Sequence, residues 1–297
     1  MGAVLALAAA VCYGASDFVA GLTSRRASSY AVAVVAQASA MVVVAAGAVA
    51  MGVAPGGAAL LWGALSGIGN GLGTAFLYRG LGSARMSVVA PLSAVGAAGL
   101  PVLVGLALGE RPSALAVAGI VLALPAVWLI SRGESGIAGD TPRRSGVLDG
   151  LLAGGGFALL FVALGRVPAG SGLWPLSLGQ AVATVTIVAS GVVAARGVVA
   201  ARRAGSGNGA RALRATLLPP RTAAVPALAV GVLGGGATIL YLFAVQRSLL
   251  SVAAVLTSLY PALTVLAAML VLREHVHRGQ AVGLAAAVGA VVLITLG

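Results

Sequence analysis

One carboxylate stands inside an otherwise apolar segment near the start of the chain. Asp17 is the only acid well inside a stretch long enough to cross a membrane, and Tyr13 and Ser16 can share its helical face. Because an ionised carboxylate in hydrocarbon is costly, such a residue normally faces protein or a water-filled cavity. The pattern suggests a coupling-proton site or the counter-ion of a substrate amine. The alternative is a solvated Asp17 near the end of its span, or an ion pair with Arg25 or Arg26.

Further polar side chains lie inside apolar segments at positions that could line one chamber. Gln37 and Gln180 occupy equivalent places in two related segments, where they could face one cavity or form an interhelical hydrogen bond worth about 0.6 kcal/mol. A binding cavity is mostly apolar with a few orienting polar groups. The other candidates for its lining, each of which could instead serve packing, are Asn70, Thr74, Tyr78, Ser93, Thr238, Tyr241, Thr257 and Tyr260.

Residues that could hold a metal or form a catalytic pair are scarce. Cys12 is the only cysteine, and the only histidines, His275 and His277, stand in a short loop without HExxH spacing. There is no lysine to complete a catalytic pair within the spans. A phosphate-binding GxxxxGK[ST] loop is also absent from the sequence. The sequence therefore predicts no metal, no cofactor, no direct use of ATP and no enzymatic activity.

The elements that must position these side chains are membrane-spanning helices. Of 297 residues, 60% are hydrophobic and 8% are charged, against roughly 25% charged residues in a soluble domain. The apolar segments do not alternate as barrel strands do, and each is about long enough to cross the bilayer as a helix. The predicted fold class is all-α integral membrane, with ten spans at 2–22, 31–51, 58–78, 86–108, 113–131, 147–165, 174–195, 224–246, 252–272 and 279–296.

The chain repeats itself. Residues 66–130 align with residues 230–294 without a gap, and Gln37 aligns with Gln180. This predicts a first five-helix repeat over 1–131, a linker over 132–146 and a second repeat over 147–297. Because five is odd, the second repeat must enter the membrane from the opposite side, which gives inverted repeats around a central cavity near the bilayer midplane.

Glycines and glutamates recur in both repeats. Small residues four apart let helices approach closely in lipid, or let them slide between states. A glutamate between two spans can cap the next helix. These matched pairs, together with the proline discussed below, form the expected structural motif, which comprises Gly67, Gly71, Gly231, Gly235, Glu110, Glu274 and Pro261.

Every basic residue is an arginine, and the net charge is +12. All but Arg111, Arg166 and Arg247 fall in loops on one side, with neither a basic helix face nor an aromatic RNA-binding motif. We therefore expect these arginines to set topology and contact anionic lipid of the bilayer, and we expect no nucleic-acid partner. If the Arg-rich side is cytoplasmic, both termini face outward.

Taken together, the sequence resembles the EamA-type branch of the drug/metabolite transporter superfamily over nearly its whole length. The first helix carries YGASDFVAG, and PALTVLAAMLVLRE has the family's proline before a glutamate that ends the fourth span, at Pro261 and Glu274. In the first repeat Glu110 fits, but Ala97 stands where the proline belongs, so helix bending is expected to differ there. The family's Arg-Phe pair near the second span is absent, and Gln37 is the nearest polar residue.

The resemblance implies ten helices around a central cavity and a multi-pass protein of the cell inner membrane. It implies export of a small metabolite, an amino acid or related compound. The inverted repeats suggest that export proceeds by alternating access, and Asp17 could couple it to protons. It also implies cytoplasmic termini, opposite to the arginine distribution. The alternative in the same superfamily is a flippase or carrier of a lipid-linked substrate. A fused pair of repeats is expected to work as a monomer or homodimer.

Overall fold

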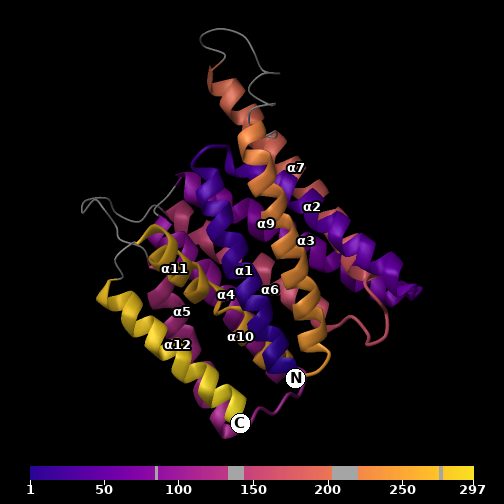
Figure 1. The fold of residues 1–297 in the computed structure, drawn as a ribbon, viewed down its shortest axis with the longest axis vertical. Coiled ribbons are helices and arrows are strands. Elements are labelled where there is room, and N and C mark those ends of the chain that lie inside the picture. The colour runs from indigo at the N-terminus through magenta and orange to yellow at the C-terminus, as the bar shows by residue number, and fades with distance from the viewer. Residues whose placement is uncertain (84–85, 133–143, 203–219, 274–276) are drawn as a thin grey trace.

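The computed structural model describes residues 1–83, 86–132, 144–202, 220–273 and 277–297, without the side chains of 78, 81–83, 86–87, 144–145 and 194–202. Every regular element within these ranges is helical (Figure 1). In chain order they are α1 (Gly2–Ser24), α2 (Ser29–Met51), α3 (Gly57–Ser83), α4 (Met86–Ala107), α5 (Ala114–Ser131), α6 (Arg144–Gly165), α7 (Trp174–Arg202), α9 (Arg221–Val245), α10 (Leu250–Thr257), α11 (Tyr260–Ala267), the π-helical turn η1 (Ala268–Leu272) and α12 (Arg278–Leu296).

The prediction of an all-α membrane protein is confirmed. The described residues contain ten helical segments long and apolar enough to cross a bilayer, with α10, α11 and η1 together forming one of them. Many side chains on the outer faces of these helices are exposed and apolar, for example Val42 (65% exposed), Leu103 (63%) and Val185 (69%). An outer surface of this kind is stable against lipid rather than water. Both termini lie at the same end of the bundle (Figure 1).

The fourth span differs between the two repeats. In the first it is the single helix α4, whereas in the second it is interrupted between Thr257 and Tyr260. Pro261 stands in the first turn of α11. Proline has no N–H to donate, and its ring crowds the carbonyl four residues earlier. The two fourth spans therefore differ in bending, as expected from Pro261 in the second repeat and Ala97 at the equivalent position of the first.

The helices of residues 1–131 interlock with those of residues 147–297, the two repeats expected from the sequence. The most extensive helix contacts join α3 to α6 and α7, α9 to α1 and α2, α5 to α12, and α4 to α6, so each pair crosses between halves. Exchanging every helix for its equivalent in the other repeat turns the contact of α3 with α6 into that of α9 with α1. The same exchange turns α3 with α7 into α9 with α2. The packing thus follows the internal repeat.

Glycines lie where these helices cross most closely. A Cβ atom added to Gly67 of α3 would collide with the carbonyl oxygen of Gly179 in α7. A Cβ added to Gly231 of α9 would likewise collide with the carbonyl oxygen of Ala36 in α2. The crossings at Gly67 and Gly231 are equivalent in the two repeats, and both need a residue without a side chain. Gly71 packs on Thr186, and Gly235 packs on Ala40.

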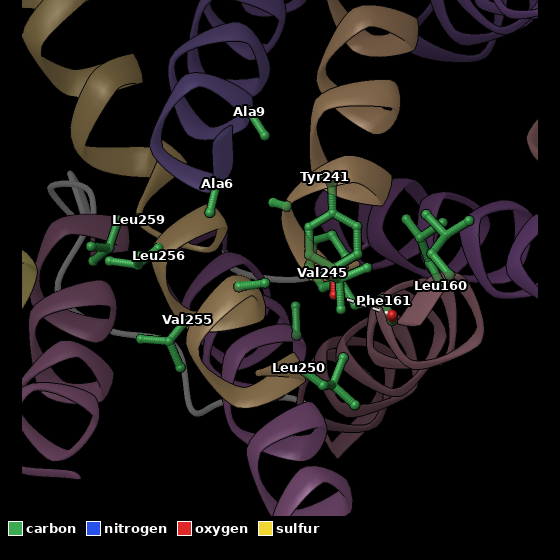
Figure 2. Close-up of a cluster of buried hydrophobic side chains, with 14 of the residues drawn as sticks. Ala6, Ala9, Leu160, Phe161, Tyr241, Val245, Leu250, Val255, Leu256 and Leu259 are labelled. Atoms are coloured by element: carbon green, nitrogen blue, oxygen red, sulfur yellow. Dashed lines mark hydrogen bonds between the residues drawn. The ribbon is translucent and has the colours of Figure 1, made fainter. Parts of the chain in front are cut away.

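An apolar cluster fills the end of the bundle that carries the termini. Figure 2 shows Ala6 of α1, Val245 of α9, Leu250 of α10 and the ring of Tyr241 directed into it. The Tyr241 and Phe161 rings lie 4.6 Å apart between centroids, and the Tyr241 hydroxyl donates to the Phe161 carbonyl oxygen at 3.1 Å. Tyr241 is fully buried. The cluster closes this end of the space between the repeats.

Candidate functional site

A cavity of about 200 Å³ lies where the two repeats meet. Its walls come from α1, α2, α3 and α4 of the first repeat and from α6, α7, α9 and α11 of the second. Most of the polar residues singled out as substrate-binding belong to this lining, although that role stays a prediction. They are Tyr13, Ser16, Asp17, Gln37, Asn70, Thr74, Gln180, Thr238 and Tyr260.

Asp17 presents an exposed side chain to this cavity. Within the described part of the chain, no hydrogen bond or ion pair involves its carboxylate. The considered pairing with Arg25 or Arg26 is therefore not found among these residues. An acid in a membrane-spanning helix that faces a cavity without a protein partner is positioned for a ligand, a proton or water.

The hydroxyl groups beside Asp17 are fixed by bonds between α1 and α9. Thr238 donates its hydroxyl hydrogen to the Gly234 carbonyl oxygen at 2.8 Å, so the 2.9 Å contact between Tyr13 and Thr238 has Tyr13 as the donor. Ser16 donates to the Val230 carbonyl oxygen at 3.0 Å. The hydroxyl hydrogens of Tyr13, Ser16 and Thr238 are thus all used within the protein, while lone pairs on their oxygens remain able to accept.

The side-chain amides of Gln37 and Gln180, one from each repeat, meet in the lining of the cavity. Gln37 of α2 donates its side-chain N–H to the side-chain oxygen of Gln180 in α7. Gln180 is 4% exposed. The two amides therefore form an interhelical hydrogen bond and also line the cavity, so the two alternatives considered for this pair occur together.

Aromatic rings form much of the remaining wall. The Tyr13 and Tyr260 rings lie 6.2 Å apart at an interplanar angle of 57°, and Phe157 and Phe161 also line the cavity. Neither phenylalanine could be recognised from the sequence, because an apolar ring within an apolar span does not stand out from its neighbours.

Three of the expected lining residues are placed differently. Tyr241 lies in the apolar cluster, Thr257 is fully buried and donates to the Ala6 carbonyl oxygen at 3.3 Å, and Ser93 is buried outside the lining. All three lie on the expected helices, but their side chains contact neighbouring helices rather than the cavity. The side chain of Tyr78 lies outside the described residues.

Glu110 does not cap the helix that follows it, contrary to expectation. The cap of α5 is Ser113, whose hydroxyl oxygen accepts the Ala116 N–H at 3.1 Å. Glu110 instead accepts the backbone N–H groups of Leu250 and Ser251, which begin α10 in the other repeat. Its equivalent, Glu274, lies outside the described residues.

A buried ion pair at the opposite end escaped the sequence analysis. Nε of Arg79 in α3 donates to Oδ1 of Asp149 in α6 at 2.9 Å. The Asp149 side chain is 3% exposed, whereas that of Arg79 is 55% exposed and lies over the Phe76 ring. The pair joins the two repeats. Among the described residues no cluster of His, Cys, Asp and Glu could hold a metal.

Comparisons with known proteins agree with this architecture. A crystal structure superimposes with a TM-score of 0.73 at 18% sequence identity, over 99% of this chain and 96% of the other, which shows a shared fold. No curated protein matches the sequence. The EamA-like transporter family matches residues 179–296, a range that includes Pro261 and Glu274. The matched segment is thus similar to the EamA-like transporter family, a family of membrane transporters within the drug/metabolite transporter superfamily.

Proposed function

We propose that the protein is a secondary carrier that exports a small metabolite, an amino acid or related compound, across the inner membrane. The observation that carries this proposal is the cavity of about 200 Å³, which is enclosed by helices of both repeats and lined by Asp17, an acid with no partner among the described residues. Carriers of this kind bind substrate near the midplane where their repeats meet. The protein is proposed to work as a monomer or homodimer, with its Arg-rich loops in contact with anionic lipid.

We further propose that transport proceeds by alternating access between inverted repeats. The exchange symmetry of the helix contacts supports it. So does an asymmetry between equivalent residues, because Tyr241 is fully buried while Leu77, its equivalent in the first repeat, lines the cavity. The end of the bundle that carries the two termini is thus more tightly packed than the opposite end. In the other state the repeats exchange these arrangements, so that Leu77 packs and Tyr241 faces the cavity.

Asp17 is proposed as the site of proton coupling. Its carboxylate faces the cavity, and substrate and proton would compete for the same group. A carboxylate that binds a proton in one state and releases it in the other links flux to a pH gradient.

Purified protein in proteoliposomes tests the proposal. Uptake and efflux of a panel of amino acids, amines and lipid-linked compounds would be measured with and without a pH gradient. We expect flux of at least one soluble metabolite, loss of its gradient dependence in Asp17→Asn, and partial retention in Asp17→Glu. Full rate and full gradient dependence in Asp17→Asn would contradict the role of Asp17. Flux of lipid-linked compounds alone would favour a flippase.

A further inference from the structure

We propose, building on the carrier function above, that the metabolite is a related compound rather than an amino acid itself: a small organic cation, namely an amine with an apolar body and no carboxylate or phosphate. The charge of the lining carries this inference. Asp17 is the only charged residue among the described lining residues. No arginine belongs to that lining, and the chain has no lysine. A site with one acid and no base balances a positively charged ligand.

The other described acids show that Asp17 is exceptional. Asp149 pairs with Arg79, and Glu110 accepts two backbone N–H groups at the start of α10. Each of these carboxylates therefore has its positive or hydrogen-bonding partner within the protein. Asp17 has none among the described residues, although the cost of an unpaired charge is greatest inside a span. A cationic ligand would supply the missing partner.

The hydrogen bonds around Asp17 favour an ammonium group over a hydrogen-bond acceptor. Tyr13, Ser16 and Thr238 all use their hydroxyl hydrogens on protein acceptors and leave oxygen lone pairs available. An ammonium group has donors only, so it is matched by lone pairs and a carboxylate. A ligand carboxylate in the same place would meet acceptors and a like charge.

The remaining wall suits the body of such an amine. Tyr13, Tyr260, Phe157 and Phe161 belong to the lining, although the ring of Phe161 also packs against Tyr241. Aromatic faces attract cations through their quadrupole and bury apolar groups. The volume of about 200 Å³ is below the roughly 300–1,000 Å³ of pockets for drug-sized ligands. The substrate is therefore smaller than a typical drug and is held by one charge and an aromatic wall.

Three probes of similar shape and different charge test this inference. They are 2-phenylethylamine, phenylalanine and 3-phenylpropionate, titrated calorimetrically into the purified protein at neutral pH. We expect the amine to bind at least tenfold more tightly than the zwitterion, and the acid not to bind. Asp17→Asn should weaken amine binding at least tenfold, while Asp17→Glu should keep most of it. Thermal unfolding of both variants identifies any loss that is due to misfolding.

The outcomes separate this inference from the carrier proposal. Tighter binding of phenylalanine or 3-phenylpropionate than of the amine would overturn the inference and leave the carrier function standing. An unchanged amine affinity in a folded Asp17→Asn variant, or no binding of the amine at all, would also overturn it. Amine binding without flux in proteoliposomes would sustain the inference and contradict the carrier function.

Discussion

Glu110 accepts the backbone N–H of Ser251 at 3.0 Å, although the two residues belong to different repeats. A second N–H, that of Leu250, points to the same carboxylate. The first turn of a helix has backbone donors without intrahelical partners, and an anion placed there is stabilised by the helix dipole. One side chain thus fastens the end of the first repeat to the start of α10.

Removing this carboxylate should destabilise the protein. We expect Glu110→Ala to lower the free energy of unfolding by about 1–2 kcal/mol, the usual cost of losing a helix cap. Chemical denaturation in detergent would measure it. The matched control is Ser113→Ala, which removes the cap of α5 within one repeat. If the contact between repeats matters for the conformational equilibrium, only Glu110→Ala should also change the transport rate.

The closest helix crossings should not tolerate a methyl group. Gly231→Ala places a Cβ against the carbonyl oxygen of Ala36, whereas the Cβ of Gly236→Ala meets no atom within 4 Å. Overpacking costs about 1–3 kcal/mol, so we expect a clear loss of thermal stability in Gly231→Ala. Gly236→Ala should leave it equal or slightly higher, because alanine favours the helix. Equal effects of the two substitutions would contradict this account of the α2–α9 crossing.

Removing Arg79 and removing Asp149 from their ion pair should destabilise the protein to different degrees. Arg79→Ala leaves Asp149, 3% exposed, as a buried charge, and we expect it to lower the free energy of unfolding by about 3–5 kcal/mol. Asp149→Asn leaves Arg79, whose side chain is 55% exposed, able to reach solvent, and should cost less. Denaturation midpoints of both single variants and of the double variant would test the order. A larger loss of stability in Asp149→Asn than in Arg79→Ala would contradict this reasoning.

The arginine distribution predicts cytoplasmic exposure of the end at which α9 begins. In a Cys12→Ser background, Thr222→Cys should resist a membrane-impermeant maleimide in intact cells, because Thr222 stands at that end. Ala169→Cys, in the loop between α6 and α7, should react. The reverse labelling pattern would place both termini in the cytoplasm, as the family resemblance implies.

The sequence was sufficient for the number and type of the spans because lipid demands long apolar helices. It was also sufficient to find Asp17, since an acid inside such a helix stands out against its neighbours. A difference between the two fourth spans was expected from Pro261 and Ala97, but the position of the break was not, since α4 stays continuous through Pro91 and Pro101. These inferences depend on a single helix and its solvent, and they need no knowledge of which helices become neighbours.

Features that depend on the pairing of distant helices could not be read in this way. The partner of Glu110 is 141 residues away in the other repeat, and its nearest helix already had a cap. Tyr241 and Thr257 lie on expected helices, but a small rotation decides between cavity and core. Asp149 stood near the start of a span and was passed over, because its partner Arg79 belongs to another helix.

The interlocking of the repeats has a consequence for biosynthesis. Since the extensive contacts of α1, α2, α3 and α5 are with helices made later, these segments enter the bilayer before their neighbours exist. Insertion and final assembly must therefore be separate events, with the early helices held by lipid or by the insertion machinery until the ribosome has produced α12. A chain truncated after the linker should be integrated normally and yet be recognised by quality-control proteases as incomplete.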